Sequence, residues 1–503
     1  MSAQVNTDRV LSIGKNALYF EDYVLSIQHF NSIIKAKPYL AEPYMYRGLA
    51  KLSLDDYKGA TADFALALER NPFLSAVYQY RGIARQSSGD YEGAITDYNK
   101  HLEFRPEDSQ TMLNKSIAYL QDKKLDEALE NLNQLLVVQP KSPKAYMARA
   151  EVYTEKGDTA QAFRDYDKAL ELDAFSAPAY HQRAMLYLQT KQYAQAVADL
   201  DQAIRLEPKR AGNHINRGLA RYHLNDLRGA MTDYDAVIRV DAHHLIARFN
   251  RGLLRSQVGD VYGALEDFDE VVKLEPDNFM AIYNRAILNE QARKYKNAIA
   301  DLDKVTREYP NYLPAYYFRS EIKRKINDIK GADTDYWYAH QLEEKLRKQR
   351  EQGKIVTGKE VYDPNKTREQ SDKDIEKFNR LVVYDKAEEQ QSKYKNELRG
   401  RVQDKQVKVE PLLTATYFEQ DAIPVAAHFD RANQLFLQKD YPAAIAGYSE
   451  AIALYPDFAE AYFNRGLAEL YLGENEKGIA DLSKAGELGV VNAYSIIKKM
   501  NEE

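Results

Sequence analysis

Residues 41–73 read AEPYMYRGLAKLSLDDYKGATADFALALERNPF, and the same pattern of small, apolar and charged residues returns every 34 positions. One position of this pattern holds a small residue in ten consecutive units without an insertion or deletion, and a second small residue follows twelve positions later. In the unit quoted, these residues are Gly48 and Ala60. Two further units, led by Ala432 and Gly466, follow after a break. A constant period of this length predicts an array of stacked supersecondary units rather than one compact globule.

Each unit reads as two amphipathic helices joined by a short turn. Apolar and aromatic residues recur at helical spacing before and after turns such as Asp55-Asp56-Tyr57. Proline ends most units, as Pro38 and Pro72 do, because it lacks the N–H group and clashes with the preceding turn. The pair of small residues lets the two helices of a hairpin approach each other closely. The sequence therefore predicts an all-α fold.

This pattern resembles the tetratricopeptide repeat family, in the variant with Arg-Gly in the first helix and Asp in the second. Residues 76–100 (AVYQYRGIARQSSGDYEGAITDYNK) and 461–485 (AYFNRGLAELYLGENEKGIADLSKA) carry the resemblance. It implies a right-handed superhelical solenoid of about twelve helical hairpins, whose first helices line the concave face. The whole arrangement is similar to tetratricopeptide proteins of Bacteroidetes-type bacteria.

Four segments are expected along the chain. Ten contiguous repeats cover residues 7–346, a charged insertion 347–424, two further repeats 425–492 and a C-terminal capping helix 493–503. Between Gln341 and Glu410, 33 of 70 residues are charged, which is typical of a solvated segment. Val402, Val407 and Val409 nevertheless predict a small β-hairpin there. A lone hairpin is marginally stable in water, so we expect it to dock on the solenoid, a partner or a second copy of the chain.

A basic residue precedes the first small residue of most units, and an acidic residue follows sixteen positions later. We interpret these pairs as salt bridges between the two helices of a hairpin rather than as paired catalytic carboxylates, because each Asp lies a full repeat from the next. Unit four has Lys115 with Asn131 instead, and Arg431 faces Gly447 and stands alone. Arg431 is expected to pair with the insertion. The nine complete pairs are Arg47–Asp63, Arg81–Asp97, Arg149–Asp165, Arg183–Asp199, Arg217–Asp233, Arg251–Asp267, Arg285–Asp301, Arg319–Asp335 and Arg465–Asp481.

Asparagine recurs at one first-helix position of units seven, eight and nine, and again in the last unit as Asn464. Its amide both donates and accepts, so a row of asparagines suits the backbone of an extended chain. The family resemblance implies the same role for Asn at this position. Apolar and aromatic residues surround the row and offer adaptable surface. The candidate peptide-binding residues are Asn216, Ile246, Phe249, Asn250, Met280, Tyr283, Asn284 and Tyr317.

An alternative interpretation of this row remains open, in which the same side chains pack between neighbouring first helices or bridge adjacent units. A clamp for a C-terminal carboxylate, which the family also uses, is not supported, because Lys15 is the only basic residue at the corresponding positions.

Catalytic and metal-binding signatures are absent from the sequence. It holds no Gly-rich phosphate loop, no G-x-S-x-G and no H-E-x-x-H, and we expect no cofactor and no enzymatic activity. The histidines His181, His214 and His223 fall on neighbouring first helices and form at most a weak cluster. Zero cysteines exclude disulfides and thiolate metal sites.

Charge and hydropathy narrow the choice of partner. The net charge of −6 is small for 503 residues, so no broad basic surface for nucleic acid is expected. No apolar run approaches the length of a membrane span. Met1-Ser2-Ala3-Gln4 fits either the scar of a removed signal peptide, hence an exported or periplasmic protein, or a cytoplasmic start.

These observations favour a non-enzymatic scaffold that binds an extended peptide or protein segment on its concave face. The alternative is a self-associating structural component of a cell-envelope or secretion assembly, in which the insertion and the terminal units make contacts in a homo-oligomer.

Overall fold

The computed structural model describes residues 7–351, 411–412 and 423–501, and every regular element in these ranges is an α-helix. The helices form ten consecutive hairpins, then two more, and end in one single helix. The all-α solenoid of about twelve hairpins predicted from the period is therefore confirmed. Val402, Val407 and Val409, on which the predicted β-hairpin depends, lie outside the described residues.

The helices belong to two compact units, and the first boundary between them in the sequence falls within α10 (Thr159–Leu172). The first unit holds α1 (Thr7–Tyr19), α2 (Tyr23–Ala36), α3 (Ala41–Ser53), α4 (Tyr57–Arg70), α5 (Ser75–Ser87), α6 (Tyr91–Phe104), α7 (Ser109–Gln121), α8 (Leu125–Val138), α9 (Pro143–Glu155), α23 (Ile423–Leu437), α24 (Tyr441–Leu454), α25 (Ala459–Tyr471), α26 (Asn475–Glu487) and α27 (Asn492–Met500). The second unit holds α11 (Ala177–Gln189), α12 (Tyr193–Leu206), α13 (Ala211–His223), α14 (Leu227–Val240), α15 (Leu245–Gln257), α16 (Val261–Leu274), α17 (Phe279–Gln291), α18 (Tyr295–Glu308), α19 (Leu313–Lys325) and α20 (Ile329–Glu351).

The turn inside each hairpin has a simple local cause. One residue adopts a positive φ, such as Asp55 at 62° or Gly89 at 85°, and reverses the chain after the first helix. In many repeats the next residue is an aspartate that caps the second helix. The carboxylate of Asp56, for example, accepts the backbone N–H of Gly59 at 2.9 Å. This cap satisfies a helix N–H that would otherwise have no partner.

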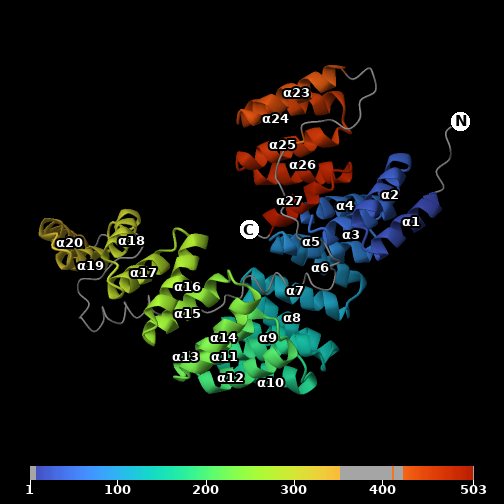
Figure 1. The fold of residues 1–503 in the computed structure, drawn as a ribbon. Helices are drawn as coiled ribbons and strands as arrows, with labels where there is room; N and C mark the ends of the chain where they lie inside the picture. The colour runs from blue at the N-terminus through green and yellow to red at the C-terminus, as the bar shows by residue number, and fades with distance from the viewer. Residues whose placement is uncertain (1–6, 352–410, 413–422, 502–503) are drawn as a thin grey trace. The chain divides into compact units, whose positions relative to one another are not determined.

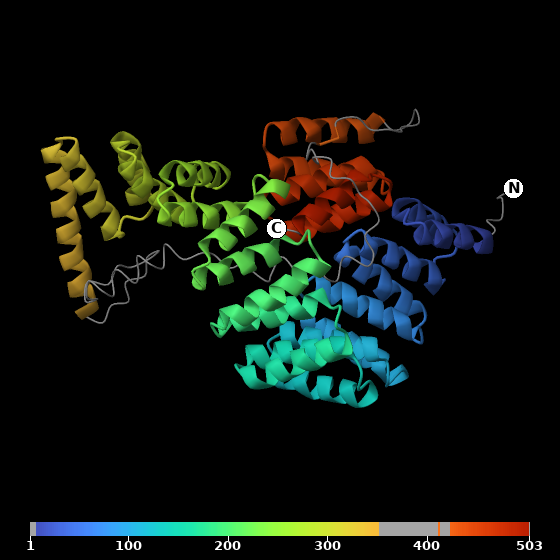
Figure 2. The ribbon, with the colours of Figure 1, turned by 60° about the horizontal axis from the view of Figure 1, so that its bottom comes forward.

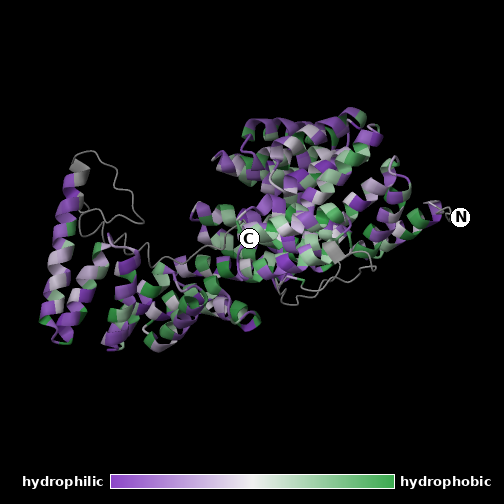
Figure 3. Ribbon diagram, turned by 90° about the horizontal axis from the view of Figure 1, so that it is seen from above, coloured by the Kyte–Doolittle hydropathy of each residue, from purple (hydrophilic) through white to green (hydrophobic). Residues whose placement is uncertain are grey.

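The two helices of a hairpin meet closely at the small residues. A Cβ added to Gly48 would lie 2.7 Å from Cε1 of Phe64, and one added to Gly82 would lie 2.6 Å from Cε1 of Tyr98. The helices carry hydrophobic and hydrophilic residues on different faces, as Figure 3 shows. Each hairpin therefore has an apolar face to bury against its neighbours, and stacking supplies the burial.

The last repeats pack against the first ones in the first unit. Helix α26 contacts α2 and α4, and Figures 1 and 2 show the C-terminal helices beside the N-terminal ones. Tyr23, Ile27 and Ala50 from the first two repeats join one buried apolar cluster with residues of α23 to α27. This contact is not predicted by the repeat pattern, which indicates only a capping helix at the C-terminal end of the array.

Buried charges cross the same contact. Glu487, at the end of α26, forms an ion pair with Lys51 of α3, whose side chain is 2% exposed. Lys51 also lies 2.9 Å from the carboxylate of Asp63. Asn31 donates to the backbone oxygen of Glu487 at 2.7 Å, and the Ser483 hydroxyl donates to Asp56. The apolar cluster and this polar network together fix the position of the C-terminal repeats on the first two.

Candidate peptide-binding surface

All nine predicted arginine–aspartate pairs form, and most of these arginines make a second contact. Arg319 donates to Asp335 of its own hairpin at 2.6 and 2.8 Å, and its Nη1 donates to Asp303 of the preceding repeat at 2.7 Å. The second acceptor lies sixteen residues before the arginine, and the first lies sixteen residues after it. We call the nine residues the repeat arginines: Arg47, Arg81, Arg149, Arg183, Arg217, Arg251, Arg285, Arg319 and Arg465.

The paired aspartates are buried, and their carboxylates are neutralised by the arginines around them. The side chain of Asp233 is 1% exposed. Burial by itself would raise its pKa, but the nearby His214 ring (3.7 Å), the hydrogen bonds from Arg217 and the charges of Arg217 and Arg221 bring this pKa below the ordinary value. Asp233 is therefore ionised and fully engaged with its cationic neighbours.

Three hairpins lack the pair. The first has Ile13 and His29 at the two positions, and the other two differ in kind. In the fourth repeat, Asn131 donates to the backbone oxygen of Met112 at 2.7 Å and to the Ser116 hydroxyl at 2.6 Å, so a neutral network replaces the ion pair. Arg431 is exposed, and within the described residues the structure gives it no ion-pair partner. The insertion, with which Arg431 was expected to pair, lies almost entirely outside those residues.

The predicted row of asparagines lies on α13, α15 and α17. Asn216 and Asn250 are fully buried, and Asn284 is 6% exposed. Nδ2 of Asn216 lies 3.1 Å from Sδ of Met185 on the preceding first helix. Nδ2 of Asn284 donates to the backbone oxygen of Met280, one turn earlier, at 2.8 Å. In this conformation, these two amides contact the repeats themselves.

The aromatic residues predicted beside this row are also largely covered. Phe249 is 5% exposed and Tyr283 is 7% exposed. The Tyr283 ring lies 5.4 Å from that of Tyr312, and burial raises the pKa of Tyr283 to about 12. Tyr317 is partly buried and donates to the carboxylate of Glu343 at 2.9 Å. Ile246 and Met280 are partly buried as well, so peptide binding by this set stays a prediction.

The asparagine of the last repeat holds an extended piece of this chain. Oδ1 of Asn464 accepts the backbone N–H of Leu412 at 2.8 Å, and its Nδ2 donates to the Leu412 backbone oxygen at 2.8 Å. Pro411 and Leu412 form no regular secondary structure, and the Leu412 side chain packs on the apolar cluster of the C-terminal repeats. One amide thus satisfies both backbone groups of a single residue.

Neighbouring polar groups hold the Asn464 amide in place. Oδ1 of Asn433 accepts from Asn464 Nδ2 at 2.8 Å and from the Tyr448 hydroxyl at 2.7 Å. Asn433 is 4% exposed, and its Nδ2 has no hydrogen-bond partner among the described residues. Asn464 occupies the predicted repeat position but is not among the candidate residues, and its partner lies 52 residues away in the insertion.

The described part of the chain gives little support to metal binding or to a histidine cluster. His181 bonds to Asn213 at 2.7 Å and His223 stacks on Tyr193 at 4.4 Å, so the histidines of this region serve different neighbours. The described ranges contain no group of three or more His, Cys, Asp or Glu side chains that could hold a metal ion. None of the described helices has the length and apolar character needed to cross a membrane.

Family models match three separate stretches of the chain. A model described as TPR repeat matches residues 432–473, and models described as Tetratricopeptide repeat match residues 113–177, 249–312 and 177–210. No curated protein matches the chain.

Several solved structures are similar in fold. PilF of Pseudomonas aeruginosa is 21% identical with a TM-score of 0.39, covering 43% of this chain and 99% of its own. YrrB, a TPR protein with an unusual peptide-binding site, is 22% identical with a TM-score of 0.34, covering 37% and 95%. A tetratricopeptide repeat protein of Parabacteroides merdae is 22% identical with a TM-score of 0.36, covering 46% and 93%. The matching family models, together with the period and the twelve hairpins of the described residues, show that this chain is built from tetratricopeptide repeats.

Proposed function

We propose that this protein is a non-enzymatic scaffold that binds an extended peptide or protein segment along its first helices. The contact between Asn464 and Leu412 carries the proposal, because it is a peptide-binding geometry within the chain itself. The amide pairs with the N–H and the oxygen of one residue, which requires an extended backbone but no particular side chain. The same groups would accept a segment from another protein.

The row at Asn216, Asn250 and Asn284 extends the proposal to the second unit. These residues occupy the repeat position that Asn464 occupies in the last repeat. Asn284 bonds to its own helix, and a peptide backbone would offer an equivalent acceptor. Ile246 and Met280 remain partly accessible beside the row, and Phe249, Tyr283 and Tyr317 complete the apolar surface for the side chains of the bound segment.

The charge distribution supports a protein or peptide as the partner. In the described repeats, the nine repeat arginines are paired with buried aspartates, so these side chains offer neither a basic surface for nucleic acid nor free carboxylates for catalysis. Recognition is therefore proposed to depend on backbone hydrogen bonds and apolar contacts.

A labelled peptide with the sequence of residues 408–417 (KVEPLLTATY) tests the Asn464 site in the full-length chain by fluorescence anisotropy. Leu412→Pro removes the N–H that Asn464 accepts, so it weakens the internal competitor. We expect this variant to bind the peptide more tightly than the wild type does. Adding Asn464→Leu to it should weaken binding by roughly tenfold, the effect of losing two hydrogen bonds.

The matched control is Gln438→Ala, which removes an exposed amide from the same pair of repeats and should leave binding unchanged. Equal peptide affinity with and without the Asn464 amide would contradict the proposal for this site. For the row in the second unit, Ile246→Ser with Met280→Ser is compared with the Asn464 variant in affinity capture of partners. A partner lost only by the Ile246/Met280 variant would assign binding to the row.

A further inference from the structure

The second helix of the tenth repeat exposes a face whose equivalent is buried in every other repeat. Tyr336 on α20 is 43% exposed, whereas the aromatic or leucine residue at the same position of every other repeat is at most 1% exposed. Trp337 beside it is 58% exposed and Tyr338 is 46% exposed. The covered counterparts of Tyr336 are Phe30, Phe64, Tyr98, Leu132, Tyr166, Leu200, Tyr234, Phe268, Leu302, Tyr448 and Leu482.

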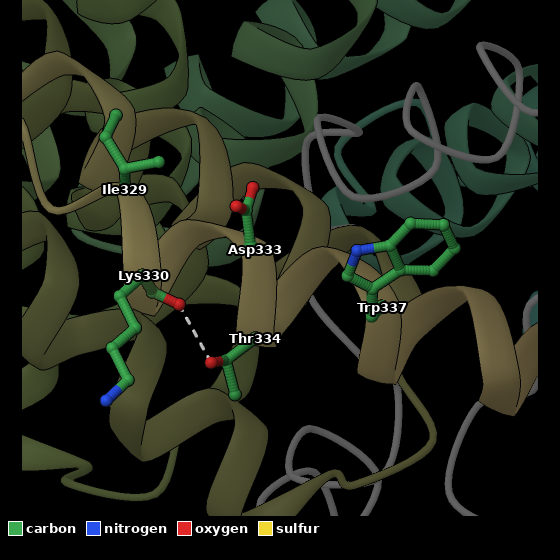
Figure 4. A pocket seen from close by; sticks show the side chains of 5 residues that line it. All are labelled: Ile329, Lys330, Asp333, Thr334 and Trp337. Atoms are coloured by element: carbon green, nitrogen blue, oxygen red, sulfur yellow. Dashed lines mark hydrogen bonds between the residues drawn. The ribbon is translucent and has the colours of Figure 1, made fainter.

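Trp337 also lines an open hollow of about 570 Å³ on α20, together with Ile329, Lys330, Asp333 and Thr334 (Figure 4). The Trp337 ring stands at one edge of it.

A similar hollow between two inner repeats indicates which kind of residue would complete the hollow beside Trp337. That hollow is lined by Thr232, Asp235, Ile238, Arg239 and Arg251. Thr232 and Asp235 are the counterparts of Thr334 and Trp337, three repeats earlier. Arg251 comes from the following repeat and donates to Asp235 at 2.7 Å. At an inner junction, a repeat arginine of the next repeat therefore completes the hollow.

The eleventh repeat presents the matching face. Its counterpart of Arg251 is Arg431, which is exposed and has Gly447 where nine hairpins have the paired aspartate. Ala427, on the same face of α23, is exposed too, although the alanine at this position is fully buried at inner junctions, as Ala247 and Ala281 are. Among the described residues, no second helix packs before the first helix of the eleventh repeat as it would in a continuous array.

We propose that α20 of one copy of the protein stacks on α23 of a second copy, with the Arg431 guanidinium over the Trp337 ring. The junction continues the stacking of the inner repeats, and a cation–π contact replaces the arginine–aspartate bond. Small Ala427 leaves room for the aromatic side chains of α20. Gln434, where inner repeats have buried apolar residues such as Leu254, keeps this face soluble in the free protein. The inference is independent of the peptide-binding proposal.

Each copy carries both faces, so the association runs head to tail. Such a contact closes into a ring if the rotation between copies permits and otherwise continues as a filament. In either case the mass of the particle depends on protein concentration.

Trp337 provides a direct probe, because it is the only tryptophan of the chain. Sedimentation of the full-length protein over a wide range of concentration should show association. Over the same range, the tryptophan emission should shift to shorter wavelength as the ring is covered. A monomer at all concentrations would overturn the proposal. So would association with an unshifted emission, because the contact would then lie elsewhere.

Charge exchange tests the pairing of the two residues. Trp337→Lys places a second cation opposite Arg431 and should abolish the association. Trp337→Lys with Arg431→Glu restores opposite charges and should recover it, at least in part. Phe175→Lys, which replaces an aromatic residue that is 82% exposed in the same unit, is the control and should associate as the wild type does. Loss of association in the control, or no recovery in the double variant, would overturn the pairing.

Discussion

Lys51 and Glu487 are separated by 436 positions in the sequence and form a buried ion pair between the second and the twelfth repeat. Arg47 and Asp63 complete the group, with 2.5 Å between Arg47 Nη2 and Asp63 Oδ1. Two cations and two carboxylates thus balance each other at the contact between the first and last repeats. Their burial makes the contact sensitive to the loss of any one charge.

Lys51→Met should destabilise this contact strongly. The substitution keeps the apolar stem but leaves Glu487 and Asp63 buried with one cation fewer, at a cost of about 3 kcal/mol. Denaturant unfolding measures the loss. The control is Lys35→Met, which breaks the 3.5 Å pair of Lys35 with Asp457 between the same parts of the chain, where the Lys35 side chain is 84% exposed. That change should cost less than about 1 kcal/mol, and equal losses would refute the central role of burial.

The stability of the first unit should depend on pH through Glu487. Burial opposes its ionisation, but the charges of Lys51, Arg47 and Lys484 outweigh burial and lower its pKa to about 2. A carboxyl whose folded pKa lies below its unfolded value stabilises the fold above the unfolded pKa. This contribution is lost as the pH falls from about 4.5 towards 2. The stability difference between wild type and Glu487→Gln should therefore shrink over that interval, and a constant difference would contradict the assignment.

Glu469 should destabilise the last repeat above neutral pH. Burial and the charge of Asp481 raise its pKa to about 7, although Arg465 opposes them. A carboxyl with a raised folded pKa weakens the fold progressively as the pH rises from its unfolded value through the folded one. Glu469→Gln should therefore stabilise the protein by roughly 1–3 kcal/mol at pH 8 and by little at pH 4. Thermal unfolding at the two pH values decides, and an equal effect at both would exclude this mechanism.

Asp233→Ala should destabilise the seventh repeat by about 3 kcal/mol, because Arg217 and Arg221 then lose their buried carboxylate. Asp201→Ala is the matched control, since Asp201 accepts from the same Arg217 but is 47% exposed. Both variants are compared by thermal unfolding, and only the first should show a large loss. Unchanged stability of Asp233→Ala would contradict the structural role of the pair.

The period of the sequence predicts the hairpins and the arginine–aspartate pairs, because the same residue types recur at the same spacing in most repeats. The second acceptor of the repeat arginines, such as Asp303 for Arg319, follows from the same sixteen-residue spacing. The pair of Lys51 with Glu487 could not be found in this way, because each residue is particular to one repeat and no periodicity connects them.

The candidate site could be predicted less well from the sequence than the fold could. The period places Asn250 and Phe249 on a first helix, but it does not show how deeply the neighbouring repeats cover them. Asn464 shares the position of Asn250, and its contact with Leu412 depends on how the insertion returns to the repeats. The repeated part of the sequence holds no information about that path.

The pairing of Lys51 with Glu487 also bears on how the chain is made. Residue 487 leaves the ribosome 436 residues after Lys51. At the usual rates of synthesis this delay is on the order of 20–90 s. Until then, the second repeat packs only on the first and third repeats, and its ammonium group lacks one of its two carboxylates. Nascent chains should therefore keep this region open to solvent and to chaperones until residue 487 has emerged.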